Sequence, residues 1–280
     1  MSELEHVPSV LDDEGEAVPR QEKQAKGGRA ALHETVRLWL GLLLLALFCL
    51  AISLAALPML VLPRATRRRK GRKLISVSSR AYLKLLSLMG ACRFDLASLD
   101  ELAGAGPMVI APNHPSLFDA VIILSRLPDA TCIMKADIVN NVLFGGCARL
   151  AGYIGTTPLR TMIKGAVDNL HEGSHVLLFP EGTRTTRHPI GALQGTTGLI
   201  AKNAHVPVQT VFVETDSGFL GKGWSLLWTP RMPITYRIRL GRRFEPPVHT
   251  AEFVAELDAY FRAELAQALL PEFPISRPRR

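Results

Sequence analysis

Closely spaced cysteines are missing from this sequence of 280 residues. Its four cysteines form no C-x-x-C pair, and no His/Cys cluster has the ligand spacing of a zinc site. These absences argue against a disulfide framework and against a metal centre. We therefore expect reduced, packed thiols in a cytosol-facing protein, with no bound metal.

Aromatic residues are also few, at 6% of the sequence, and no basic stretch is of the aromatic-rich kind that binds RNA. The net charge of +8 nevertheless favours an anionic partner. The cations gather beside an apolar run and at the C-terminal end, where a lipid surface or a phosphorylated substrate fits better than nucleic acid. We expect no nucleic-acid partner.

Large apolar side chains are scarce in residues 1–30, which are rich in Glu, Asp, Gln, Gly and Lys. Such a segment buries too little surface to offset the entropy of ordering it, so we predict a disordered tail that is too polar for a signal peptide. The remaining length suits one sizeable α/β domain with appendages.

Charge is absent from residues 38–62, LWLGLLLLALFCLAISLAALPMLVL. At ~1.5 Å per residue this run would extend roughly 37 Å as a helix, enough to cross a ~30 Å hydrocarbon layer. We predict a transmembrane or membrane-embedded helix over 36–63. Two alternatives are a buried core helix and a re-entrant hairpin that breaks near Pro58 and dips into one leaflet.

Cations follow the apolar run at once. Seven of the ten residues 64–73 are Lys or Arg, and residues 74–90 carry apolar side chains at helical spacing, with Arg80 and Lys84 on the other side. We interpret 64–90 as a basic, amphipathic membrane-surface segment, in which the helix over 74–90 lies on the membrane or on the domain. Because Lys and Arg are enriched on cytoplasmic flanks, the following domain is expected on the cytoplasmic side of the inner membrane.

Short apolar runs and helical stretches alternate through residues 91–275. The expected strands are 107–111, 131–135, 175–179, 206–213 and 234–240, and the expected helices are 118–127, 138–151, 159–172, 191–204 and 250–270. Apolar strands separated by helices predict an α/β fold, a single domain with a mostly parallel sheet flanked by helices.

Polar residues follow the first of these strands, at the kind of position where functional side chains gather in parallel sheets. His114 comes just after the strand, and Asp119 lies at the start of the next helix. An aspartate placed there can reach the imidazole, fix its tautomer and stabilise its protonated form. Asp119 alone would be an ordinary helix cap, and Ser116 lacks the G-x-S-x-G context of a hydrolase nucleophile. We predict that His114 and Asp119 form a catalytic pair.

The expected strand at 175–179 leads into a second polar loop, PEGTR at 180–184. Gly182 allows close backbone approach to a ligand, Thr183 offers a hydroxyl, and Arg184 can bind a phosphate with two hydrogen bonds. A turn with a solvent-exposed arginine is the alternative.

Together, NHPSLFD at 113–119 and FPEGTRT at 179–185 resemble the lysophosphatidic acid acyltransferase family, also called the glycerophospholipid acyltransferases. The resemblance runs from about 90 to 245. It implies that His114 is the general base and that Asp119 orients it. It also implies an acceptor-binding role for Glu181, Gly182, Thr183 and Arg184.

Two further blocks of the family are recognisable. The family's G-x-I-F-V-x-R block is imperfect here, because GYIGTTPLR at 152–160 lacks the aromatic and displaces Arg160, the arginine implied to assist phosphate binding. Residues 206–208, VPV, meet the last block. The stretch ETDSGFLGKGW at 214–224, followed by RLGRRF, also resembles a bacterial subgroup associated with polyene-pigment lipids. The acceptor therefore stays open.

The resemblance implies a membrane-bound O-acyltransferase of phospholipid biosynthesis. It would move a fatty acyl group from acyl-CoA or acyl-ACP, the acyl carrier protein thioester, to a lipid acceptor, with no cofactor beyond this co-substrate. The leading acceptor is the hydroxyl of 1-acyl-glycerol-3-phosphate, and a lyso-ornithine lipid or a polyene-pigment lipid is the alternative. Two other classes are an esterase and a non-catalytic membrane lipid-binding protein.

Overall fold

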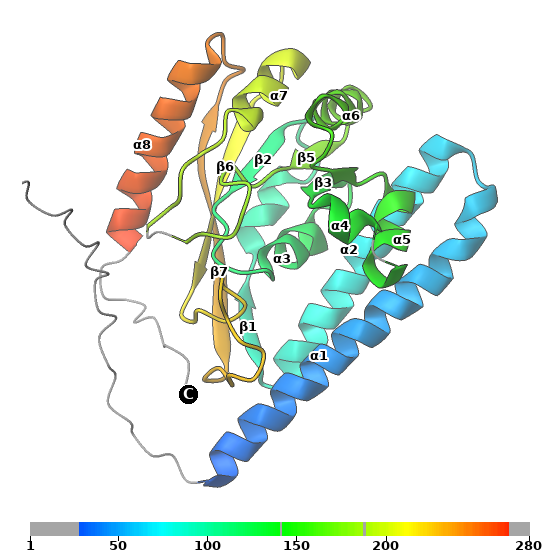
Figure 1. The fold of residues 1–280 in the computed structure, drawn as a ribbon, viewed down its shortest axis with the longest axis vertical. Coiled ribbons are helices and arrows are strands. Elements are labelled where there is room, and N and C mark those ends of the chain that lie inside the picture. The colour runs from blue at the N-terminus through cyan, green and yellow to red at the C-terminus, as the bar shows by residue number, and fades with distance from the viewer. Residues whose placement is uncertain (1–27, 141, 187–188, 269–280) are drawn as a thin grey trace, which may run out of the picture.

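A seven-stranded sheet forms the centre of the computed structural model, which describes residues 28–140, 142–186 and 189–268 (Figure 1). The strands are β1 (Cys92–Asp95), β2 (Val109–Pro112), β3 (Ala130–Met134), β4 (Ile154–Gly155), β5 (His175–Leu177), β6 (Val208–Thr215) and β7 (Ile234–Phe244). Their order in the sheet is β1-β7-β6-β2-β5-β3-β4. All neighbours pair in parallel except β6 and β7. The predicted α/β fold with a mostly parallel sheet is confirmed.

Both faces of the central strands are buried, which explains why the strands read as continuous apolar runs rather than as alternating ones. Ile110 of β2 and Val211 of β6 point into one hydrophobic cluster. Val109 and Phe212, their sequence neighbours, point into the other. Two strands were missed by the sequence pattern, β1 and β4, because they have only four and two residues.

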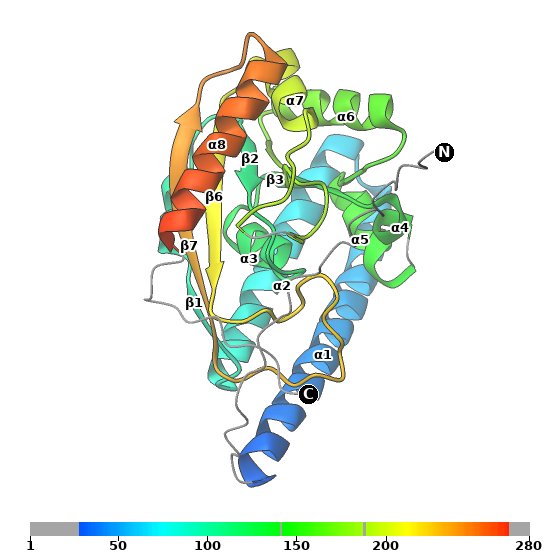
Figure 2. The ribbon, with the colours of Figure 1, turned by 60° about the vertical axis from the view of Figure 1, so that its left-hand side comes forward.

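Helices cover the two faces in separate sets (Figures 1 and 2). One face carries α6 (Leu159–His171), α7 (Thr196–Ala204) and α8 (Thr250–Ala268); the other carries α2 (Arg64–Leu88), α3 (Asp119–Arg126), α4 (Ala136–Asn140) and α5 (Val142–Ala151). The 3-10 turns are η1 (Leu57–Val61) and η2 (Ala97–Leu102). Helix α1 (Gly28–Ala56) packs outside α2 and α5.

Two predicted helices differ from the observed ones. The helix expected over 138–151 is replaced by α4 and α5, with residue 141 between them outside the described residues. The helix expected from 191 begins only at Thr196. The residues expected in its first turn make other hydrogen bonds instead. The amide of Gly191 donates to Glu181, and the amide of Gln194 donates to the Pro180 carbonyl.

The apolar run forms the first arm of a helical hairpin. Residues 28–30, assigned above to the tail, already belong to α1, whereas residues 1–27 lie outside the described part. The helix stops at Ala56, and Pro58 stands at the start of η1, before α2 turns back. Within the described residues, 32–61 is the one stretch long and apolar enough to cross a membrane.

Helix α2 is built into the domain rather than only resting on its surface. Its buried residues are Gly71, Arg72, Ser76, Tyr82, Leu83 and Leu86. The guanidinium of Arg72 donates hydrogen bonds to the side chains of Thr131 in β3 and Asn169 in α6, at 3.2 and 3.4 Å. The second arm of the hairpin is therefore fixed to the sheet.

Gly71 marks the closest approach of α2 to α5. A Cβ at this position would lie 2.9 Å from the Cα and the N of Ala151, so Gly71→Val should push the helices apart and destabilise the fold by about 1–3 kcal/mol. Gly106→Val is the control, because a Cβ there meets none of the described atoms within 4 Å. Thermal unfolding followed by circular dichroism should show a lower Tm for the first variant only; equal Tm values would contradict this packing.

Candidate active site

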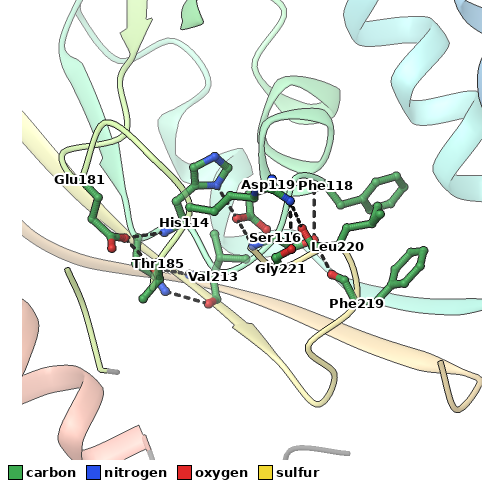
Figure 3. A network of polar contacts seen from close by, with 12 residues as sticks. His114, Ser116, Phe118, Asp119, Glu181, Thr185, Val213, Phe219, Leu220 and Gly221 are labelled. Carbon is green, nitrogen blue, oxygen red and sulfur yellow. Dashed lines mark hydrogen bonds and ion pairs between the residues drawn. The ribbon is translucent and has the colours of Figure 1, made fainter. Parts of the chain in front are cut away.

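His114 and Asp119 are in direct contact at the carboxyl end of β2 (Figure 3). The imidazole Nδ1 lies 2.8 Å from Oδ2 of Asp119, and the backbone amide of Ser116 donates to the same oxygen at 2.8 Å. The histidine side chain is 13% exposed and the aspartate is fully buried. With Nδ1 occupied by the carboxylate, Nε2 is the ring nitrogen left to face a substrate.

The aspartate sits in a poorly solvated position. Burial raises the pKa of the Asp119 carboxyl above its ordinary value, and the hydrogen bonds from His114 and Ser116 oppose that rise. Its Oδ1 has no hydrogen-bond partner among the described residues. A carboxylate with so little solvation interacts strongly with a nearby cation, so it would stabilise a proton taken up by His114.

Phe179 holds the histidine ring from its face. The two rings stack with centroids 3.7 Å apart and an angle of 19° between their planes. Phe179 follows β5, the neighbour of β2 in the sheet. The imidazole is thus held by a hydrogen bond to Asp119 at one edge and by an aromatic ring on one side.

Glu181 contacts the backbone of the histidine loop. It is 4% exposed, and its Oε1 accepts hydrogen bonds from the His114 amide at 3.2 Å and from the Thr185 hydroxyl at 2.6 Å. Its Oε2 accepts from the Gly191 amide at 2.8 Å. The Thr185 amide in turn donates to the His114 carbonyl at 2.8 Å. These contacts fit a residue that positions His114.

Gly182 and Thr183 form the turn after Glu181. The backbone of Gly182 has φ +65°, and a Cβ there would overlap the side chain of Gln194. Glycine is therefore required by the turn as well as by the packing. Gly182 is exposed and Thr183 is half-buried.

Arg184 reaches a loop that the sequence reasoning did not place at the site. Its Nη1 donates to the carbonyls of Leu220 and Gly221 at 2.8 and 2.9 Å. These residues follow β6, the other neighbour of β2. The signal was present in the sequence, since the ETDSGFLGKGW stretch begins at the end of this strand.

Two polar residues of the NHPSLFD stretch serve the structure. The side-chain amide of Asn113 pairs with both the N–H and the carbonyl of Val213, at 2.7 and 3.1 Å, and so prolongs the pairing of β2 with β6. Ser116 is buried and its hydroxyl donates to the Phe219 carbonyl at 2.9 Å. A serine held in this way is not poised as a hydrolase nucleophile.

Arg160 comes from a different element than the other predicted residues. It is exposed in the first turn of α6, which follows β4. Although β4 is the third strand beyond β2, α6 itself also contacts β5, the direct neighbour of β2. Within the described part of the chain, no group of three or more His, Cys, Asp or Glu side chains is arranged to hold a metal ion.

A family comparison defines the class of protein. Residues 93–214 match a protein-family model described as Acyltransferase. The matched segment contains the His114–Asp119 pair and the whole PEGTR loop. The chain is therefore an enzyme that transfers acyl groups.

Known proteins narrow the class. The 1-acyl-sn-glycerol-3-phosphate acyltransferase of Pseudomonas aeruginosa is 22% identical over 82% of this chain and 92% of its own length. The lyso-ornithine lipid O-acyltransferase of the same bacterium is 31% identical, over 46% of this chain and 51% of its own length. The crystal structure of the 1-acyl-sn-glycerophosphate acyltransferase from Thermotoga maritima has 17% identity and a TM-score of 0.66, covering 86% of this chain and 98% of that one. The chain thus contains an acyltransferase domain and is similar, along most of its length, to enzymes of the lysophosphatidic acid acyltransferase family.

Glu181 offers a test of positioning against substrate binding. Glu181→Gln replaces one acceptor oxygen by an NH₂ group, which cannot accept from the Gly191 or His114 amide. Because a shift of about 1 Å in a catalytic group can cost roughly 10²-fold, we expect kcat to fall by 10- to 100-fold with little change in the KM of the acceptor. A raised KM at unchanged kcat would instead indicate contact with the substrate. Glu172→Gln, at an exposed position, is the control.

Proposed function

We propose that this enzyme transfers a fatty acyl group from acyl-CoA or acyl-ACP to the hydroxyl of a lysophospholipid, with His114 as general base. The observation that carries the proposal is the 2.8 Å contact between His114 and the buried Asp119. A hydroxyl attacks a thioester poorly while it keeps its proton. Nε2 of His114 removes that proton as the new C–O bond forms, and the imidazolium then protonates the departing thiolate.

An apolar cavity lined in part by α3 supports a hydrocarbon substrate. It measures about 200 Å³ and lies between α1, α2, α3 and α5. Its walls include Leu45, Phe48, Tyr82, Ala120, Val121 and Tyr153. Ala120 and Val121 belong to α3, the helix that begins with Asp119, so one wall of the cavity comes from the helix that carries this aspartate. Apolar walls favour an acyl chain over any polar part of the substrates.

The acceptor we propose is 1-acyl-glycerol-3-phosphate. The relative that matches this chain along most of its length is named for that substrate. Arg184 is the candidate for its phosphate, because both of its hydrogen bonds to the 220–221 carbonyls come from Nη1, and a guanidinium has further N–H groups on Nε and Nη2. A lyso-ornithine lipid is the second candidate, supported by a relative named for that substrate that is 31% identical over 46% of this chain. Arg160, exposed in the first turn of α6, is the second candidate for binding the phosphate of 1-acyl-glycerol-3-phosphate.

The proposed location is the cytoplasmic face of the inner membrane, with α1 embedded in one leaflet. One face of α1 packs on the domain through Leu38 and Phe48. The opposite face exposes a continuous apolar stripe: Leu32, Val36, Trp39, Leu40, Leu43, Leu47, Leu50 and Leu54. A helix that crossed the bilayer in this arrangement would carry the cation-rich α2 into hydrocarbon, at a high cost. An in-plane position puts the stripe in lipid and leaves the 64–73 cations at the headgroups.

His114→Ala should reduce acyl transfer by about 10²- to 10⁴-fold, the usual contribution of a general base. The assay measures transfer of a radiolabelled acyl group to lysolipid in purified membranes. His171→Ala, an exposed histidine at the end of α6, should retain wild-type activity. Near-normal turnover of a folded His114→Ala protein would overturn the proposed mechanism.

Arg184→Gln distinguishes the two acceptors. If Arg184 binds the acceptor's phosphate, its loss should raise the KM for 1-acyl-glycerol-3-phosphate about tenfold or more and leave the KM for lyso-ornithine lipid, which lacks phosphate, nearly unchanged. Equal losses on both acceptors, with lowered kcat, would show that the residue only fastens the 220–221 loop. The comparison requires initial rates with each lipid in identical vesicles.

A further inference from the structure

The connection between β6 and β7 contains an exposed apolar tip. We name residues 222–231, KGWSLLWTPR, the tryptophan loop. At its centre Leu226 and Leu227 are 49% and 81% exposed. Adjacent exposed leucines on a connecting loop are costly in water, and such a patch marks an interaction site.

Aromatic packing makes this tip rigid. The rings of Trp224 and Trp228 meet edge to face with centroids 6.0 Å apart, and Trp224 meets Phe219 in the same way at 5.7 Å. The two leucines therefore lie next to a packed cluster of aromatic rings, which supports the conformation of the loop. Tryptophan is also enriched at the boundary between headgroups and hydrocarbon.

The tryptophan loop lies beside the N-terminal half of α1 (Figure 2). The hydroxyls of Thr35 and Thr229 are 3.2 Å apart, and the Met232 amide donates to Glu34 at 3.5 Å. The exposed stripe of α1 begins in this same half of the helix, at Leu32, Val36 and Trp39. The two apolar surfaces are thus neighbours.

Charge complementarity selects the partner. Lys222 and Arg231 are both exposed at the two ends of the tryptophan loop. Cations that flank an apolar tip with a tryptophan pair are the arrangement expected for an anionic lipid surface, in which the tip enters the acyl boundary and the cations remain among phosphates.

We propose that the tryptophan loop is a second membrane-contacting element, which inserts Leu226 and Leu227 into the same leaflet as α1. The proposal rests on the proposed membrane acyltransferase function and extends it. Just before this loop, the Phe219 carbonyl accepts from Ser116 and the 220–221 carbonyls accept from Arg184. Insertion of the loop would therefore hold the entrance of the active site against the lipid surface from which the acceptor comes.

The first experiment measures contact between the tryptophan loop and lipid independently of enzymatic activity. The chain has three tryptophans, so Trp39→Phe leaves only Trp224 and Trp228 as fluorophores. The full chain is reconstituted into vesicles of phosphatidylglycerol and phosphatidylcholine, with bromine on the acyl chains of the phosphatidylcholine. We expect strong quenching relative to unbrominated vesicles. Equal fluorescence in the two kinds of vesicle would overturn the proposal.

The second experiment reads the consequence for catalysis. Leu226→Asp/Leu227→Asp should lower acyl transfer to a long-chain lysolipid in vesicles by roughly tenfold or more, the effect of no longer burying a leucine. Transfer to a short-chain, water-soluble lysolipid should stay unchanged. The matched control is Val248→Asp, which changes a 70% exposed residue beyond the opposite end of β7.

The comparison of the two lysolipids distinguishes failure of the proposed membrane contact from failure of the proposed function. Equal losses on both acceptors, or no loss on either, would overturn the membrane role of the loop while leaving the enzyme an acyltransferase. A wild-type chain that acylates neither lysolipid would refute the proposed function, and the quenching experiment would still decide whether the loop contacts lipid.

Discussion

The parallel pairing of β2 between β5 and β6 is the constraint on which the site depends. Parallel neighbours end at the same edge of a sheet, so this pairing brings together three loops that are far apart in the sequence. The first carries His114 and Asp119, the second carries Glu181 and Arg184, and the third supplies the 219–221 carbonyls. Each loop satisfies polar groups of another: Glu181 accepts from the His114 amide, and Ser116 donates to Phe219. A shift of β5 against β2 would break the first of these bonds and a shift of β6 against β2 would break the second, so the register of the sheet determines the position of the imidazole.

Part of this arrangement can be predicted from the sequence, because some of its contacts join residues that are close together in the chain. His114 and Asp119 are five residues apart, and a strand end followed by a helix start is enough to bring them into contact. The central strands β2, β3, β5 and β6 were found because burial on both faces makes them largely apolar. Glu181 was expected to bind substrate, and nothing in the PEGTR letters shows that its partners would be the amides of His114 and Gly191. Those partners follow from the strand order, which sequence periodicity does not specify.

The helical hairpin shows a second limit of sequence patterns. A run as uniformly apolar as 38–62 carries no sign of which face packs on protein and which faces lipid. The distinction arises from the tertiary packing: Gly41 approaches Leu86 of α2, whereas Leu43 and Leu47 are exposed. Similarly, the basic stretch predicted to lie on a membrane surface contains Arg72, which the fold buries against Thr131 and Asn169. Charge and hydropathy place the hairpin near a membrane, and only tertiary packing orients it.

Arg184 connects the proposed phosphate site with the proposed membrane contact of the tryptophan loop. An acyltransferase of this kind must bring a donor that arrives from water and an acceptor that arrives from a bilayer to one imidazole. In the proposed arrangement α1 and the tryptophan loop contact the same leaflet on neighbouring surfaces, and Arg184 joins the loop to the PEGTR turn through the 220–221 carbonyls. A guanidinium fastened there by Nη1 would meet a lipid phosphate at headgroup depth, while the acyl chain enters the apolar cavity lined in part by α3. The acceptor hydroxyl would then be delivered to Nε2 of His114 without leaving the interface, so the acceptor need not be transferred into bulk water, where its hydrocarbon chain is unfavourable.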